Sequence, residues 1–159
     1  SLFDGALAMD AELDSTTSRI DTALVASLAA LLEGSTQRAR TILEPVRAEA
    51  EADPTRAPLF LVRLARALAA EGDRERAAKL ATEALARVER GERTSHADAP
   101  ELYFTLHELL PGHPGHDSFL VQARTRLDAR AAHIRTDAYR EHFLTQNWPN
   151  REIREAGPA

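Results

Sequence analysis

The chain has 159 residues, of which 43% are hydrophobic and only 5% aromatic, and it contains no cysteine. This length fits one domain that buries about two-thirds of its unfolded surface. Alanine, leucine, valine and isoleucine must therefore build the core, and because alanine is the best helix former, the composition favours packed helices over a sheet. The absence of cysteine excludes disulfides, thiolate metal ligands and cysteine nucleophiles.

The net charge of −5 argues against a nucleic-acid partner. Proteins that bind nucleic acid present a basic face to the phosphates, whereas arginines here alternate with acids, as in residues 73–76. The longest apolar run, residues 23–32, contains Ser27 and is too short to span a membrane. The N-terminus also lacks the pattern of a signal peptide. We therefore predict a cytoplasmic protein without a nucleic-acid or membrane partner.

The first predicted elements form a helical hairpin. Residues 1–17 are interpreted as a short helix or as the trailing half of a preceding repeat, and since the chain begins at Ser1 without methionine, we expect a segment of a longer protein. A helix is predicted over 18–33, because Gly34 suits the position just after a helix. Its partner runs from about residue 35 to 52, with a kink or break at Pro45, which has no N–H to donate.

A second hairpin follows from residue 53. Asp53 is predicted either to cap a helix that begins at Pro54 or to precede a helix that begins at Pro58. This helix runs to Glu71, and Gly72 then turns the chain into a helix over 74–90, which Asp73 caps and Gly91 ends. The helix-ending glycine thus recurs after 38 residues, from Gly34 to Gly72, a period typical of stacked helix pairs.

The third predicted hairpin pairs residues 98–110 with residues 118–134, and Asp98 is expected to cap its first helix. The joining loop, residues 111–117, contains two prolines and two glycines and is predicted to be non-helical. A short helix over 137–146 and a last turn over 151–155 complete the chain. No strand is expected.

Small and apolar residues recur at matching places in the first two hairpins. In the second they are Leu61, Leu64, Ala65, Leu68, Gly72, Ala77, Ala81 and Ala84, and in the first they are Ala26, Ser27, Ala30, Gly34, Ala39, Leu43 and Val46. This pattern resembles tetratricopeptide-like (TPR-like) repeats, in the longer-repeat form of large bacterial signalling proteins. The stretch with Arg130–Ile134, Arg140, Phe143-Leu144 and Pro149–Ile153 looks like the end segment of such bacterial arrays.

The resemblance implies an all-α, right-handed stack of about three antiparallel hairpins over residues 18–159, with a capping segment at 137–155. It also implies a non-catalytic protein–protein interaction or regulatory scaffold within a larger bacterial cytoplasmic protein. It transfers no catalytic residue to this chain.

The first helix carries a second apolar stripe, and a helix that is apolar all round must be covered on both sides. Two interpretations stay open for this stripe. It is buried against residues 1–15 or the hairpin behind it, or it is a contact surface for a partner helix, another repeat or a second copy. In a TPR-like stack, the inner faces of the first helices would bind a peptide, a partner protein or a neighbouring domain. The predicted partner-binding residues are Leu24, Leu28, Val62, Arg63 and Arg66.

The alternative function is a self-contained helical bundle that binds a small ligand or a metal, with an enzymatic use left open. Its candidate site is the loop with His113, His116 and Asp117, one helix end away from His107. Structural zinc usually takes four fixed ligands, and a loop of prolines and glycines is poorly preorganised, so we predict no metal and no other cofactor. The chain also lacks a nucleophile elbow and a phosphate-binding glycine loop, so no catalytic residue is assigned.

Several arginines near the C-terminus have two interpretations as well. They could recognise an anionic partner, or they could pair with nearby acids, and we predict pairing. The arginines are Arg135, Arg140, Arg151 and Arg154, and the acids are Asp137, Glu141, Glu152 and Glu155.

Overall fold

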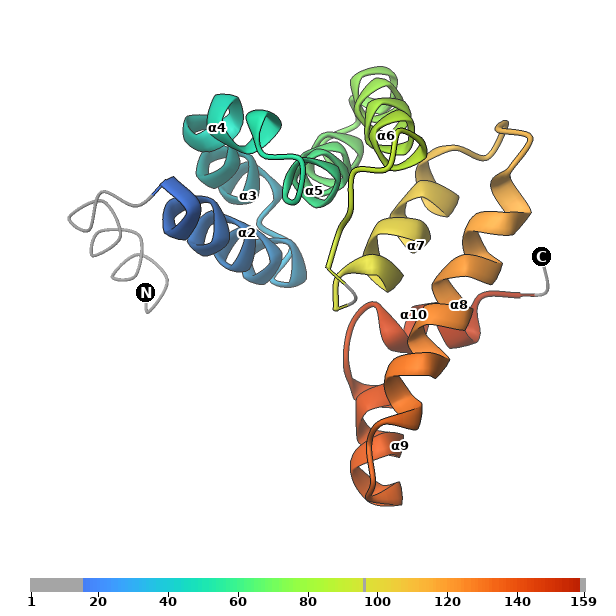
Figure 1. Cartoon of the computed structure of the whole chain (residues 1–159). Coiled ribbons are helices and arrows are strands. Elements are labelled where there is room, and N and C mark those ends of the chain that lie inside the picture. The colour runs from blue at the N-terminus through green and yellow to red at the C-terminus, as the bar shows by residue number, and fades with distance from the viewer. Residues whose placement is uncertain (1–15, 96, 158–159) are drawn as a thin grey trace. The chain divides into compact units, whose positions relative to one another are not determined.

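The computed structural model describes residues 16–95 and 97–157 (Figure 1). In these two ranges every regular element is a helix and none is a strand, so the predicted all-α class is confirmed. The element expected over 1–17 lies outside the described residues, except that its last two residues begin a helix. The chain divides into two compact units, residues 1–93 (unit 1) and residues 94–159 (unit 2).

None of the described helices combines the length and the apolar character that crossing a bilayer requires.

The first hairpin of unit 1 pairs a straight helix with a return segment that bends at a proline. The straight helix is α2 (Thr16–Leu32), and the return segment consists of α3 (Thr36–Leu43), the 3-10 turn η1 (Glu44–Val46) and α4 (Arg47–Ala52). Pro45 cannot donate a helical hydrogen bond, and the chain tightens to the 3-10 form at that point. The interruption predicted at Pro45 is confirmed.

The second hairpin pairs α5 (Ala57–Ala70) with α6 (Arg74–Glu89). Of the two predicted starting points, the structure has the later one, because α5 begins at the residue before Pro58. Asp73 caps α6 as predicted, since its carboxylate accepts a hydrogen bond from the backbone N–H of Arg76 at 3.2 Å. This hairpin is the most regular part of the chain.

Asp53 stabilises a turn ahead of α5 and does not cap the helix itself. Its Oδ1 accepts hydrogen bonds from the backbone N–H groups of Thr55, at 2.8 Å, and Arg56, at 3.3 Å. Burial raises the pKa of Asp53, but the hydrogen bonds from Thr55 and Arg56 outweigh burial and hold that pKa below its ordinary value. The Arg56 guanidinium also binds Asp21 of α2 through two hydrogen bonds of 2.6 and 2.9 Å. The turn therefore ties α2 to the start of α5.

Three glycines end helices in the same way. Gly34, Gly72 and Gly91 have φ angles of 75°, 93° and 92°. At each, the glycine N–H bonds the carbonyl three residues back, and the next N–H bonds the carbonyl five residues back, with N···O distances of 2.8 to 3.1 Å. Glycine suits this position because its missing Cβ removes the cost of a positive φ. Gly34 and Gly72, which are 38 residues apart, therefore share one capping geometry with Gly91.

We expect Gly72→Ala to lower the free energy of unfolding by about 1–2 kcal/mol, the cost of a left-handed conformation for an L residue. A Cβ at Gly72 would meet no atom within 4 Å, so this cost is conformational and not steric. Gly112→Ala is the matched control, because a Cβ there is equally unhindered and φ is not positive. Urea denaturation of both variants measures the difference, and equal losses would contradict the explanation.

Helix α5 holds unit 1 together, because it contacts α2, α3, α4 and α6. All its residues from Ala57 to Leu68 are buried, with the exception of Arg66. Ala30 of α2, Ala39 of α3 and Ala67 of α5 form one buried cluster, and their small side chains let the three helices approach closely. The second hairpin therefore packs on the first through α5.

Unit 2 consists of four helices in the described residues. They are α7 (Ala99–Leu109), α8 (His116–Ala132), α9 (Asp137–Gln146) and α10 (Asn150–Glu155). The bounds of α9 match the prediction. Helices α7 and α8 form the third predicted hairpin, and α10 contacts both α8 and α9.

Two local predictions for unit 2 are wrong. The Asp98 side chain does not bond the first turn of α7, because its carboxylate accepts the hydroxyl proton of Ser95 instead. Helix α8 begins at His116 and not at Ser118, whose hydroxyl donates to the carbonyl of Gly115 at 2.7 Å from within the first helical turn. In both cases a serine hydroxyl takes a local bond that the sequence pattern does not specify.

The core of unit 2 gathers residues from three helices. Phe104 of α7, Leu120, Ala123 and Leu127 of α8, and Ile153 of α10 are all buried together. Two further aromatic or apolar side chains from α9 pack against this cluster. The short C-terminal helix therefore contributes directly to the core.

Two arginines fix the later helices of unit 2 through main-chain carbonyls. Arg124 of α8 donates from Nε to the carbonyl of Ile153 at 3.2 Å. Arg140 of α9 donates to the carbonyls of Ala131 and Ile134, at 3.2 and 2.6 Å, where α8 ends. The last carbonyls of a helix have no partner within the helix, so these guanidinium groups supply donors that the helix ends lack.

Candidate functional site

The structure places the five predicted partner-binding residues in two environments. Leu24 is 6% exposed, Val62 0% and Arg63 5%, so these three side chains belong to the core. Leu28 and Arg66 are half-buried. A fully buried side chain cannot contact a partner unless the helices rearrange. Only Leu28 and Arg66 therefore stay available for the predicted surface.

Arg63 has a structural contact in place of the predicted partner contact. Its Nη1 donates a hydrogen bond to the main-chain carbonyl of Leu24, which also accepts the hydroxyl proton of Ser27 at 2.9 Å. A buried guanidinium is costly unless its N–H groups find acceptors. Arg63 thus joins α5 to α2.

One face of α5 lies against the first hairpin. It includes Arg56 at the start of the helix, Arg63 and Ala67, which are spaced as residues on one side of a helix are. Arg56 binds Asp21, Arg63 binds the carbonyl of Leu24, and Ala67 packs in the cluster with Ala30. These contacts define the side of α5 that packs on the first hairpin.

A shift of 38 residues, the spacing of Gly34 and Gly72, carries the positions of Arg56, Arg63 and Ala67 onto Ser18, Val25 and Ala29 of α2. Val25 and Ala29 are apolar, whereas Ser18, at the position of Arg56, is polar. Val25 is 55% exposed, and Leu32, on the same side one turn after Ala29, is 57% exposed. We call Val25, Ala29 and Leu32 the α2 back face. On α5 the corresponding face is covered by a hairpin, whereas on α2 much of it is accessible to solvent.

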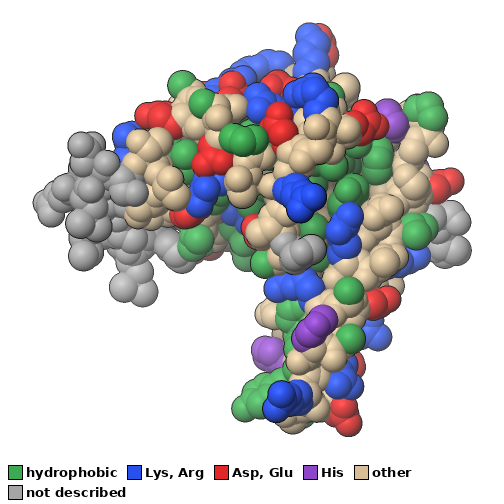
Figure 2. Space-filling view, viewed as in Figure 1, with side chains coloured by type: hydrophobic (Ala, Val, Ile, Leu, Met, Phe, Trp, Pro, Cys, Tyr) green, Lys and Arg blue, Asp and Glu red, His purple; other side chains and the backbone are tan. Residues whose placement is uncertain are grey.

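Charged side chains are paired over much of the surface. Figure 2 shows Lys and Arg intermixed with Asp and Glu on the visible face. Near the C-terminus the predicted pairing is confirmed for three arginines, whereas Arg135 is exposed and forms no ion pair with a described residue. The pairs are Arg140–Asp137 at 2.7 Å, Arg151–Glu152 at 2.9 Å and Arg154–Glu141 at 3.9 Å.

The histidines of the loop between α7 and α8 serve local contacts. His113 accepts a hydrogen bond at Nδ1 from the backbone N–H of Gly115 at 2.9 Å. The rings of His107 and His116 stack, with centroids 4.1 Å apart, and stacked rings do not point their nitrogens at a shared ion. Among the described residues, no three His, Asp or Glu side chains are grouped as metal ligands. The geometry does not favour the alternative function at His113 and His116.

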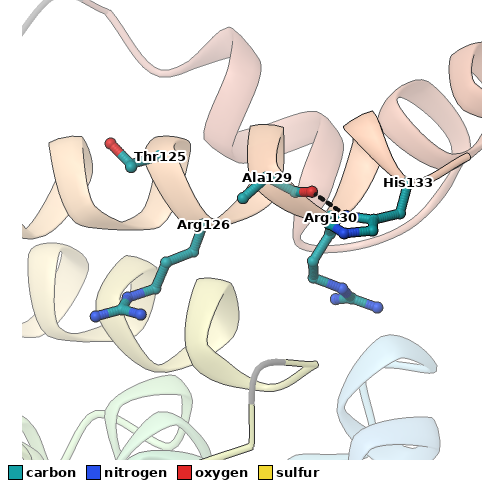
Figure 3. Close-up of a pocket in the computed structure, with 5 residues that line it drawn as sticks. All are labelled: Thr125, Arg126, Ala129, Arg130 and His133. Carbon is teal, nitrogen blue, oxygen red and sulfur yellow. Dashed lines mark hydrogen bonds between the residues drawn. The ribbon is translucent and has the colours of Figure 1, made fainter.

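A pocket of about 750 Å³ lies along one face of α8 (Figure 3). Its lining residues are Thr125, Arg126, Ala129, Arg130 and His133. The sequence interpretation did not identify this site. The signal it overlooked is a pair of arginines one helical turn apart, at 126 and 130.

No protein-family model, no curated protein and no solved structure matches this chain.

Proposed function

We propose that this chain is a non-catalytic interaction or regulatory segment, of TPR-like type, from a larger bacterial cytoplasmic protein. In this proposal the α2 back face binds a neighbouring helical hairpin of the same protein or a helix of a partner protein. One observation carries the proposal: Val25 and Leu32, on one side of α2, are large apolar side chains that are 55% and 57% exposed.

The contacts of α5 suggest the chemistry of this occupant. Where α5 meets the first hairpin, the crossing helices present alanines, Ala30 and Ala39, and a main-chain carbonyl. The α2 back face offers Val25 and Leu32 in place of the polar arginine found on α5. We therefore expect an occupant whose helices carry small and apolar side chains at the crossing, with Leu28 at the edge of the same surface.

Photo-crosslinking from position 25 tests this proposal. With a photoreactive amino acid at Val25, we expect one discrete crosslinked product, whose peptides identify the bound helical segment by mass spectrometry. The same substitution at Val121 of α8 is the matched control, because Val121 is also a large apolar side chain and is 53% exposed. Equal crosslinking from both positions, or none from position 25, would contradict the proposal. A product of twice the chain mass would make a second copy the occupant, and light scattering would show it.

Leu28→Asp is expected to abolish binding of the crosslinked partner without loss of helical circular dichroism, because the new charge would have to be buried in an apolar contact. Val121→Asp should leave binding unchanged. If the Leu28→Asp protein unfolds, Leu28 is a core residue and not part of the binding surface.

A further inference from the structure

Unpaired positive charge gathers where α8 meets α9. Arg130, near the end of α8, and Arg135, in the connecting turn, form no ion pair with any acid among the described residues. Both acids of α9 are already bound to other arginines, at 2.7 and 3.9 Å. The whole chain has a net charge of −5, so the sign of the charge at this junction is opposite to that of the chain.

The nearest acid of α8, Asp128, lies on the other side of that helix. Successive helical residues turn by about 100°, so Asp128 is about 180° away from the direction midway between Arg126 and Arg130. Figure 3 shows these two arginines on one side of α8, with guanidinium groups that point away from each other along the helix. Arginines that diverge in this way do not enclose a small ion, but they suit a chain whose charges are several ångströms apart.

An exposed aromatic ring lies beside these charges. The Cζ atom of Arg130 lies 5.1 Å from the ring centroid of Phe143 on α9. Tyr139 precedes Phe143 by four residues, so it lies on the same side of α9 and one turn nearer to Arg135. Tyr139 is 72% exposed, the largest value among the exposed large hydrophobic side chains of the described residues. Tyrosine and arginine contribute most of the binding energy at many protein interfaces.

We propose that Arg130, Arg135 and Tyr139, together the α9 junction surface, bind an acidic segment of a partner protein that also carries apolar side chains. Carboxylates would accept hydrogen bonds from the guanidinium edges, which stacking on an aromatic face leaves accessible. An apolar side chain of the segment would pack on the ring of Tyr139. Nucleic acid is disfavoured, because a few separated arginines in an acidic chain neutralise too few phosphates. This surface does not depend on the α2 back face or on its occupant.

A fluorescein-labelled peptide of glutamates interrupted by single leucines is the probe, and the same peptide with glutamine in place of glutamate is its uncharged control. By fluorescence anisotropy at low salt, we expect saturable binding of the acidic peptide alone. R130Q and R135Q should each weaken this binding about two- to fivefold, the range of exposed ion pairs. Tyr139→Ala should weaken it by about fivefold or more, whereas Tyr139→Phe keeps the ring and should stay within about twofold.

Two substitutions elsewhere are the matched controls. R74Q removes an arginine of unit 1 that is also exposed and forms no ion pair with a described residue, and it should change peptide affinity by less than about 1.5-fold. Val121→Ala trims a side chain of α8 that is 53% exposed, and it should leave the affinity unchanged.

Three outcomes would overturn the proposal. The glutamine peptide could bind as tightly as the acidic one, R74Q could weaken binding as much as R135Q, or a single-stranded oligonucleotide could bind more tightly than the acidic peptide. If R130Q does not fold by circular dichroism, R135Q and Tyr139→Ala carry the comparison, because both replace exposed side chains.

Discussion

Phe60→Ala is expected to lower the free energy of unfolding of unit 1 by about 3–5 kcal/mol. Phe60 is 0% exposed and is the largest of the fully buried side chains. It belongs to α5, which contacts the other described helices of unit 1, so no single helix can move in to fill the cavity. The loss combines the transfer of the ring out of water with the cavity that its removal leaves.

One urea titration with two signals measures this effect. The only tryptophan of the chain, Trp148, lies in unit 2, so its fluorescence follows unit 2 while circular dichroism follows the helices of both units. In Phe60→Ala we expect the circular dichroism midpoint to fall, and the Trp148 transition shows whether unit 2 unfolds with unit 1. Val25→Ala is the control, because it trims a side chain that is 55% exposed and should cost no more than about 0.5 kcal/mol. A loss below about 1 kcal/mol in Phe60→Ala would show that the site repacks.

Ile153→Ala is expected to destabilise unit 2 by about 2–4 kcal/mol. Helix α10 has only six residues, too few to be stable in isolation, and it depends on its docking contacts. Ile153 is 0% exposed and supplies the apolar side chain by which α10 enters the core of unit 2. Without that side chain, α10 keeps its hydrogen bonds from Arg124 but loses its buried apolar contact. These bonds go to the carbonyls of Ile153, Ala156 and Gly157.

Trp148 fluorescence and hydrogen exchange of the α10 amides report this change. Ile153→Val should cost about 0.5–1.5 kcal/mol, because it removes a single methylene group from the same site. Arg151→Ala lies on the same helix with a side chain that is 57% exposed, and it should stay within about 0.5 kcal/mol. Faster exchange in α10 without a lower unfolding free energy would mean that α10 opens separately from the rest of unit 2.

Short-range signals predicted the helices well. The glycine caps, the interruption at Pro45, the cap at Asp73 and the bounds of α9 follow from backbone rules that act over a few residues. The errors at Asp98 and Ser118 are also local, since a serine hydroxyl can bond several nearby groups and the sequence does not show which one it chooses.

The candidate surfaces were harder to predict, because they depend on which helix faces which. The first helix is apolar all round, so the sequence does not show which of its sides is buried. Leu24 and Val25 are neighbours in the sequence, and only the packing of the helices makes Leu24 buried and Val25 accessible. The arginines of α8 that line the pocket lie against Tyr103 and Phe143, which come from other helices. Their positions beside Arg126 and Arg130 follow from the tertiary structure and have no spacing signature in the sequence.

The hydrogen bond from Arg63 ends on a main-chain carbonyl of α2, and this choice of acceptor has an evolutionary consequence. A carbonyl is present whatever amino acid occupies position 24, so the junction restricts the residue on α5 but not the one on α2. The other two links restrict α2 more, because one uses the carboxylate of Asp21 and the other needs the small side chain of Ala30. Of the three links between the hairpins, only the one from Arg63 therefore tolerates any side chain at its acceptor position.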